Sequence, residues 1–321
     1  MRIRSSLRAG VLLAVLSPPV ASAACTTPPD PGPGGGDSHP SGYTLQFADE
    51  FEGTQLDRGT WCTRYIYGGG PTAQADPECT RNGDGNLDFL NDEQQRYVDT
   101  NRSGERMHVV GGGVLSLRAT RTRDDGWASY ESAMIRSKET FRPSGSTSYY
   151  VTARVRMPDV VGTWPAFWLN SDRRPDGSTT WPPEIDVFDG ALNGREDTND
   201  MLHQAAIIRG AQTASGNREY TFTAPEFDRQ WNNFHAAGNL RARWVETSVE
   251  WTSTGVCYFV DGYRTACENY RWVENGGNQA APAHVLVNLA IGGSWAGRHG
   301  IDDTGIPTQF DVDWVRVYRR G

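Results

Sequence analysis

Several protein classes are excluded by what the sequence lacks. No apolar run approaches the ~20 residues of a membrane-spanning helix, which excludes a polytopic membrane protein. The five cysteines include no C-x-x-C pair, which weakens zinc and redox interpretations. The 39 acidic residues outnumber the 31 basic ones for a net charge of −8, whereas a nucleic-acid binder needs a basic face. No repeat of 20–50 residues occurs, and helical periodicity is scarce.

Glycine and tryptophan are the abundant residues instead. The chain has 321 residues, of which 36 are Gly and 11 are Trp. A glycine-rich chain with many aromatics is typical of a turn-dense β scaffold, and abundant Trp indicates flat ligands such as sugars. The length is ample for one large domain with a substantial core.

The first 23 residues have the three parts of a secretory signal peptide. Basic residues come first, residues 9–16 form an apolar run, and Ala21-Ser22-Ala23 is an A-x-A cleavage site. We therefore expect secretion, either extracellular or periplasmic. Cys25 follows the cleavage site, but Ser22 stands where lipoprotein signals usually carry Leu, so free secretion is favoured over lipid anchoring. No membrane span is expected.

A linker and one folded domain follow the signal. Residues 24–42 are a Pro/Gly-rich tract that cannot bury apolar surface, so we expect a flexible or extended linker. The rest is interpreted as one domain over 43–320. Its cysteines suggest two local disulfides, Cys62 with Cys79 and Cys257 with Cys267, because export leads to an oxidising compartment. The second pair flanks Asp261-Gly262, a hairpin turn signal.

Short β-rich segments separated by turn residues run through this domain. Residues 152–157 alternate with period 2, as in a half-buried antiparallel strand, and residues 225–237 are the best helix candidate. Many strands with few helices predict an all-β sandwich or jelly roll. The expected strands cover residues 107–110, 114–119, 149–157, 248–252, 256–260, 284–290 and 310–318.

Three acidic residues lie within one β-rich segment, residues 181–189. On a regular strand Glu184 and Asp186 share one face, about 6.8 Å apart along the chain, and Asp189 falls on the other. A bulge between residues 187 and 188 would bring Asp189 back to the same face. Close carboxylates raise one another's pKa, which suits a general acid beside a nucleophile. Spacing alone leaves a solvated acidic strand or a calcium ligand cluster equally open.

Five sequence blocks support a family resemblance, and they occur in order along residues 43–319. They are FADEF at 47–51 followed by Leu56-Asp57 and Trp61, NDEQQRY at 91–97, ARVRMP at 153–158 with GTWPAFWL at 162–169, VNLAIGGSW at 287–295, and DWVRVY at 313–318. On these blocks the chain resembles glycoside hydrolase family 16, in its laminarinase-like branch of secreted β-glucanases.

The resemblance implies a fold, a reaction and roles for the acidic strand. The fold would be a concanavalin A-like β-sandwich jelly roll with an open substrate cleft. The enzyme would be a monomeric endo-glycanase that cleaves β-1,3- or mixed-linkage β-glucan with retention and needs no cofactor. Glu184 would be the nucleophile, Asp186 would orient and tune it, and Asp189 would be the acid/base.

One departure from the family falls on the acid/base itself. The family carries Glu where this chain has Asp189, and Asp is shorter by about 1.5 Å. A misplacement near 1 Å costs roughly 10²-fold in rate. Two alternatives therefore accompany the enzyme hypothesis: a catalytically impaired β-glucan-binding protein, and a transglycosylase or exopolysaccharide-processing enzyme of the same fold.

Sugar-binding candidates flank the family blocks. Trp side chains stack on pyranose faces, although core packing is their commoner role, and Asn side chains donate to and accept from hydroxyls. His203 corresponds to a His that family members often place in the cleft. Glu93 and Arg136 are ambiguous, and Trp314 is assigned to structure. The substrate-binding candidates are Asn91, Trp164, Trp168, Trp181, His203, Asn288 and Trp295.

Two further features are a candidate calcium site and an insertion relative to the family. Asp313 matches the position where several family members bind a structural calcium, for which oxygen ligands are suited. Residues 236–247 add about ten residues relative to the family and include Arg241, Arg243 and Trp244. This insert would either reshape one end of the cleft or, as we expect, form a surface excursion without a role.

Overall fold

The computed structural model describes most of the predicted domain. The predicted signal peptide, Cys25 and nearly all of the predicted linker lie outside the described residues. Among the described residues, no helix is long and apolar enough to cross a membrane. The described residues are 39–67, 73–74, 79, 86–122, 128–207, 232–274 and 277–321.

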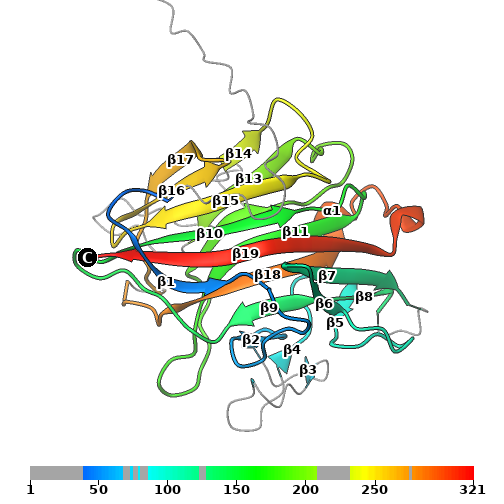
Figure 1. Ribbon diagram of the computed structural model, residues 1–321, viewed down its shortest axis with the longest axis horizontal. Helices are drawn as coiled ribbons and strands as arrows, with labels where there is room; N and C mark the ends of the chain where they lie inside the picture. The colour runs from blue at the N-terminus through cyan, green and yellow to red at the C-terminus, as the bar shows by residue number, and fades with distance from the viewer. Residues whose placement is uncertain are drawn as a thin grey trace, which may run out of the picture.

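The larger sheet contains ten strands of the described chain. They are β1 (Thr44–Asp49), β5 (Gln95–Tyr97), β6 (His108–Gly111), β7 (Val114–Arg121), β8 (Tyr130–Ser132), β10 (Ser148–Arg156), β15 (Trp244–Trp251), β16 (Gly255–Val260), β17 (Tyr263–Asn269) and β19 (Thr308–Arg320). The order is β17-β16-β15-β10-β19-β7-β8-β5, with β1 beside β19 and β6 beside β7. In Figure 1 the long red strand β19 crosses almost the whole molecule with β1 alongside.

The second sheet carries the acidic strand near its middle. Its seven strands are β2 (Trp61–Cys62), β9 (Met134–Ser137), β11 (Thr163–Ser171), β12 (Glu184–Asp189), β13 (Met201–Ile207), β14 (Asn232–His235) and β18 (Ala283–Ile291). They run in the antiparallel order β14-β13-β12-β11-β18-β9-β2. The remaining elements are the β3–β4 pair (Ala73–Gln74 and Asn86–Leu87), the helix α1 (Gly293–Ala296) and the 3₁₀ turn η1 (Asp303–Gly305).

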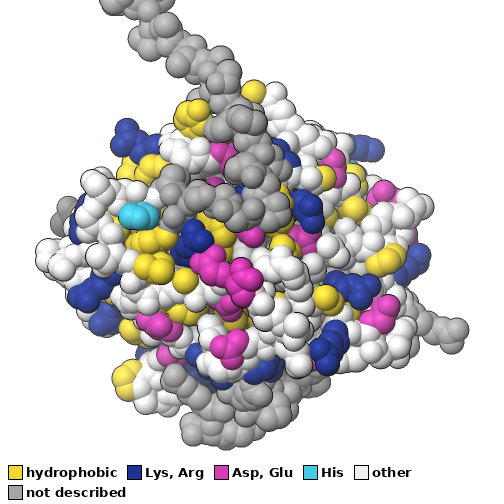
Figure 2. Space-filling model, viewed as in Figure 1, with side chains coloured by type: hydrophobic (Ala, Val, Ile, Leu, Met, Phe, Trp, Pro, Cys, Tyr) yellow, Lys and Arg dark blue, Asp and Glu magenta, His cyan; other side chains and the backbone are white. Residues whose placement is uncertain are grey.

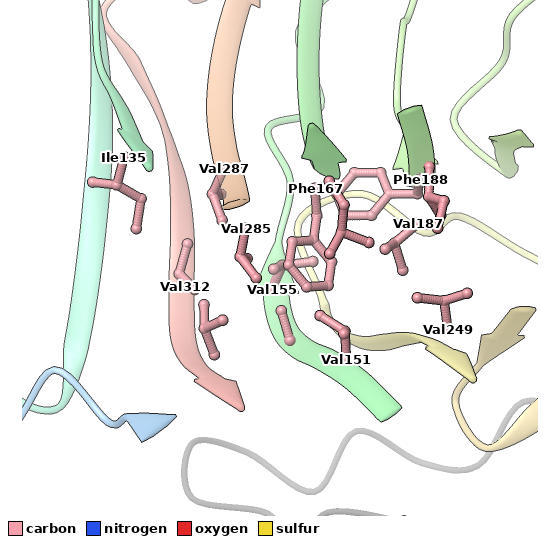
Figure 3. Packing of buried hydrophobic residues seen from close by; sticks show 14 of the residues in the cluster. Ile135, Val151, Val155, Phe167, Val187, Phe188, Val249, Val285, Val287 and Val312 are labelled. Carbon is pink, nitrogen blue, oxygen red and sulfur yellow. The ribbon is translucent and has the colours of Figure 1, made fainter. Parts of the chain in front are cut away.

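A continuous hydrophobic core lies between the two sheets. In Figure 3, Val151 and Val155 of the larger sheet lie toward Phe167 of the second sheet, and Val312 lies toward Val285. All five side chains are fully buried, and the cluster extends through both sheets. Two sheets packed face to face around one core confirm the all-β jelly-roll prediction. This packing leaves the outer face of the second sheet for a site.

The sequence located the strands better than the helix. All seven expected strands are present, with ends that shift by a few residues. The helix expected over 225–237 is wrong where the structure describes it, because residues 232–235 form strand β14. Their backbone pairs with β13, so tertiary pairing overrides a weak local helical pattern. The rest of that segment lies outside the described residues.

Both expected disulfides are present, Cys62–Cys79 and Cys257–Cys267. Asp261 and Gly262 have positive φ angles of 49° and 77°, as the predicted two-residue hairpin turn requires. A bulge between β16 and β17 then places Cys257 directly opposite Cys267. Without it, Cys257 would face the residue before Cys267.

Strand β10 is buried on both faces, so the half-buried expectation for residues 152–157 is wrong. Its inward residues enter the core, while outward Arg154 pairs with buried Asp313 at 2.7 Å and lies beside the ring of Trp244.

Acidic and basic side chains are interspersed over the face of the molecule seen in Figure 2. No metal-binding group of three or more His, Cys, Asp or Glu occurs among the described residues, and calcium at Asp313 stays a prediction.

The insert over 236–247 is not a surface excursion. Leu240, Arg241 and Trp244 are buried, and residues 244–247 begin strand β15. The guanidinium of Arg241 donates to the carbonyl oxygen of Gly190 at 2.6 Å, directly after β12. The expectation failed because buried carbonyl groups at the end of a strand need donors, which Arg241 supplies. The insert thus supports the backbone that follows Asp189.

Candidate active site

The bulge expected in the acidic strand is present. Opposite β11, Phe188 faces Phe167 and Asp186 faces Trp168, so Val187 is the extra residue. Val187 and Phe188 are both buried in the core. The bulge returns the following residue to the outer face of the sheet, where Glu184, Asp186 and Asp189 line one cleft.

Strand β11 forms the neighbouring part of the cleft floor. Its alternate residues Trp164, Ala166, Trp168 and Asn170 all line the cleft, as period-2 alternation requires. Trp164 and Trp168 thus share one face of the strand, because they are four residues apart. Asn170 was missed, although the same alternation points to it.

The cleft has a volume of about 640 Å³. It crosses four adjacent strands, β18, β11, β12 and β13, which at ~4.8 Å per strand spacing spans about 14 Å. Loops build its walls. Its lining comprises Tyr65, Tyr67, Leu90, Asn91, Asp92, Glu93, Trp164, Ala166, Trp168, Asn170, Trp181, Glu184, Asp186, Asp189, Ile207, Asn288, Ser294 and Trp295.

Two indole groups hold the outer carboxylates of the strand. Trp181 Nε1 donates to Glu184 Oε2 at 2.8 Å, and Trp164 Nε1 donates to Asp189 Oδ1 at 2.7 Å. Asn170 Nδ2 also donates to Glu184 Oε2, at 3.3 Å. Hydrogen bonds from N–H donors fix the direction of a carboxylate and favour its ionised form.

Burial raises the pKa of each of the three acids. For Glu184 the hydrogen bond from Trp181 lowers the pKa against the effect of burial, and the charge of Asp189 raises it. For Asp189 the bond from Trp164 and the charge of His203 both lower the pKa against burial. Burial raises the pKa of Asp186 most clearly, and the charges of Glu184 and Asp189 add to it. Burial and these neighbouring charges favour the protonated form of Asp186, whose carboxyl is hydrogen-bonded to Glu184.

A polar network joins several residues of the cleft lining. Trp168 Nε1 donates to Asn288 Oδ1 at 2.8 Å, and Asn288 Nδ2 donates to the hydroxyl of Tyr97 at 3.1 Å. Glu93 Oε2 accepts from Gln95 at 2.6 Å. Burial raises the pKa of Glu93 to about 7, although the hydrogen bond from Gln95 lowers it. Trp168 and Asn288 therefore line the cleft with their polar atoms already paired inside the protein.

The other candidates divide between the cleft and its support. Asn91, with a positive φ of 52°, lines the cleft from a loop. His203 is buried behind Trp295, with ring centroids 4.9 Å apart, and is not part of the lining. Arg136 is buried outside the lining and donates to the backbone oxygen of Arg64 at 3.1 Å. Trp314 is buried, as its structural assignment requires.

Asp197 is a residue that sequence reasoning missed. Its carboxylate contacts His203 Nε2 at 2.7 Å and accepts from Trp295 Nε1 at 2.8 Å, beside the cleft. It lies in a loop after β12, where no periodicity or family block marks it. Tyr65 and Tyr67 were missed for the same reason, because loop residues are brought to the cleft only by the tertiary fold.

Comparisons with known proteins identify the family of the chain. The family model described as glycosyl hydrolases family 16 matches residues 94–316. The chain belongs to this family. It is therefore a glycoside hydrolase, and the resemblance expected from the five sequence blocks is confirmed.

Individual members of the family match over most of the domain. A β-glucanase from Rhodothermus marinus is 31% identical over 268 residues, covering 81% of this chain and 84% of the relative. The glucan endo-1,3-β-glucosidase A1 of Niallia circulans is 27% identical over 87% of this chain, which spans only 38% of that relative.

Solved structures share the fold at lower identity. The laminarinase from Rhodothermus marinus superposes with a TM-score of 0.60 at 24% identity, covering 86% of this chain and 97% of that one. The endo-1,3-β-glucanase from Streptomyces sioyaensis has a TM-score of 0.63 at 20% identity, covering 89% and 100%. Both likenesses concern the fold alone.

Proposed function

We propose that this family 16 glycoside hydrolase is a secreted endo-β-glucanase. It cleaves β-1,3- or mixed-linkage β-glucan with retention of configuration. The observation that carries the proposal is the bulged strand β12, which presents Glu184 and Asp189 to one aromatic-lined cleft with an indole donor on each carboxylate. The folded domain corresponds to residues 43–320.

The substrate assignment is supported by the relatives and by the cleft. The relative from Rhodothermus marinus carries the name β-glucanase. The cleft of this chain has the aromatic side chains Trp164, Trp181 and Trp295 on its surface, which suit the apolar faces of pyranose rings. Its extent across four strands exceeds a single sugar ring, which suits a site that binds within a chain.

In the first step Glu184 acts as the nucleophile. Its ionised Oε attacks the anomeric carbon and forms the glycosyl-enzyme bond while the glycosidic C–O bond breaks. The protonated carboxyl of Asp189 gives its proton to the departing oxygen, which leaves as the hydroxyl of the released sugar. Burial of Asp189 favours this role, because it raises the pKa of the carboxyl.

In the second step Asp189 acts as the base. Its carboxylate takes a proton from a water molecule whose oxygen attacks the anomeric carbon, and the bond to Glu184 breaks. The sugar is released with its original configuration, and both carboxyl groups return to their starting protonation. Asp186, which keeps its proton beside Glu184, orients the nucleophile and stabilises its charge through their hydrogen bond.

Secretion is part of the proposal. Two disulfides are typical of proteins from oxidising compartments, and the first 23 residues match a signal peptide. We expect the exported protein to begin after residue 23.

The direct test measures new reducing ends from laminarin and lichenan. Wild type should release them, and Glu184→Gln, which keeps the shape but removes the nucleophile, should lose at least about 10³-fold in kcat/KM. The matched control is Glu52→Gln, an exposed position. If wild type matches Glu184→Gln on β-glucans, galactans and exopolysaccharides alike, the enzyme proposal fails, and binding without hydrolysis would then support a glucan-binding protein.

A further inference from the structure

We propose that Asp197 is a positioning residue for the acid/base Asp189, acting through His203 and through the Trp295–Trp164 pair. The inference rests on the proposed function, because it concerns how that reaction protonates its leaving group.

Asp197 collects three side-chain contacts in a buried position. Its Oδ1 lies 2.7 Å from His203 Nε2, while its Oδ2 accepts from Trp295 Nε1 at 2.8 Å and from Asn193 Nδ2 at 2.6 Å. The carboxylate is 5% exposed, so solvent does not compete for these contacts. Buried hydrogen bonds to a charged group are the stronger kind and hold their partners in fixed directions.

The loop that carries Asp197 is itself rigidly held. Asn193 Oδ1 accepts the backbone N–H groups of Arg195 and Asp197, at 2.9 and 3.1 Å. The N–H of Gly194, whose φ is +76°, donates to the carbonyl oxygen of Asp197 at 3.1 Å. This loop starts four residues after Asp189, so Asp197 has a fixed place relative to the end of β12.

The first route to Asp189 runs through His203. This residue lies directly opposite Asp189 in the pairing of β12 with β13. Its ring is held from both sides, by Asp197 at Nε2 and by Asn233 Oδ1, 2.9 Å from Nδ1. The charge of His203 lowers the pKa of Asp189 against burial, so the position of this ring affects the acid directly.

The second route runs through two tryptophans. Trp295, held by Asp197, packs edge-to-face on Trp164 with ring centroids 4.8 Å apart. Trp164 in turn donates its indole N–H to Asp189 Oδ1 at 2.7 Å. One carboxylate therefore fixes both neighbours of the acid/base.

The nucleophile is supported by different residues. Glu184, at the opposite end of β12 from Asp189, is held by Trp181 and Asn170. A defect at Asp197 should therefore weaken protonation of the leaving oxygen and spare nucleophilic attack. Substrates with activated leaving groups, which need no proton, separate the two effects.

The experiment compares kcat/KM of Asp197→Asn on laminarin and on 2,4-dinitrophenyl β-laminaribioside. For a retaining enzyme, kcat/KM of the aryl glycoside reports only on formation of the glycosyl-enzyme. Asn replaces one carboxylate oxygen with an NH2 group, so either the contact with His203 or the acceptor of Trp295 and Asn193 is altered. We expect a loss of about 10- to 100-fold on laminarin and less than about threefold on the aryl glycoside.

The matched control is Asp200→Asn, three residues further on. Asp200 bonds Thr198 and His235 near the surface, and in the described part of the chain no bond connects it with the cleft. It should retain both activities. Trp295→Phe is the second variant, because it removes the N–H donor to Asp197 and keeps a smaller aromatic ring; it should reproduce the selective loss on laminarin more weakly.

Three results would overturn the inference. In the first, Asp197→Asn has the same kcat/KM as wild type on both substrates. In the second, Asp197→Asn loses kcat/KM equally on both substrates. In the third, Asp197→Asn fails to fold, and Trp295→Phe shows an equal loss on both substrates or no loss. Circular dichroism and thermal melting identify a folding failure. A wild type inactive on both substrates is a different result, because it refutes the proposed β-glucanase function instead.

Discussion

Trp164 donates its indole N–H to Asp189 at 2.7 Å, from the strand next to the one that carries the acid. A second indole N–H donates to Glu184 at 2.8 Å, from Trp181, which lies three residues before it in the chain. In both cases the indole lowers the pKa of a carboxyl that burial raises. The two tryptophans thus partly offset burial, one on each catalytic candidate.

The first prediction concerns Trp164→Phe. Loss of the indole N–H should raise the pKa of Asp189 further, because the bond favours the ionised carboxylate. The acid must be protonated to donate, so the alkaline limb of kcat/KM against pH should move to higher pH by about one unit. The pH–rate profile on laminarin measures the shift, and an unmoved alkaline limb would contradict it.

Trp181→Phe is the matched variant on the nucleophile. Loss of the Trp181 indole N–H should raise the pKa of Glu184. Because Glu184 must be ionised to attack, activity should then be lost at a higher pH when the solution is acidified. The acid limb should therefore move up while the alkaline limb stays. If both variants move the same limb, the two roles are assigned wrongly.

The acidic strand shows how far the sequence could predict the site. The spacing of Glu184, Asp186 and Asp189 required a bulge to join all three, and that bulge is present at Val187. The prediction succeeded because side-chain direction along a strand is a local property with period 2. The convergence of His203 and Asp197 depends on a loop path and on packing beneath Trp295, for which the sequence has no periodic signal.

Local patterns failed where tertiary contacts decide the structure. Residues 232–235 are strand because β13 offers an edge to pair with. The insert was expected at the surface because connecting loops usually lie there, yet Arg241 is buried against the carbonyl of Gly190. A charged residue predicts exposure only when the fold offers it no buried hydrogen-bond acceptor.

The second prediction is Asp189→Glu. A longer side chain would restore the acid of the family, but here the backbone after Asp189 is held by Arg241 and the carboxylate is held by Trp164. Glu would extend the carboxyl by about 1.5 Å beyond this donor. We therefore expect kcat/KM on laminarin to fall by roughly 10-fold.

An increase in kcat/KM would show instead that the short acid limits the rate. Asp189→Asn is the companion variant, because it keeps the length and removes the proton. It should lose activity on laminarin and retain most of it on the dinitrophenyl glycoside, which needs no acid.

The third prediction concerns stability and Glu93→Gln. Burial raises the pKa of Glu93 from 4.5 to about 7, so the folded protein holds this proton more tightly than the unfolded chain. The ionised side chain therefore costs stability, and the cost grows as pH rises from 4.5 to about 7 and is complete above it. Gln has no proton to lose and keeps an oxygen for the N–H donor of Gln95.

Glu93→Gln should therefore be more stable than wild type at pH 8, by on the order of 3 kcal/mol, since a tenfold change in proton affinity is about 1.4 kcal/mol. The gain should shrink toward zero at pH 4.5, where wild-type Glu93 is protonated in the folded state. Urea unfolding at the two pH values measures it, with the exposed Glu52→Gln as control. An equal difference at both pH values would show that packing, rather than the buried charge, sets the stability at this position.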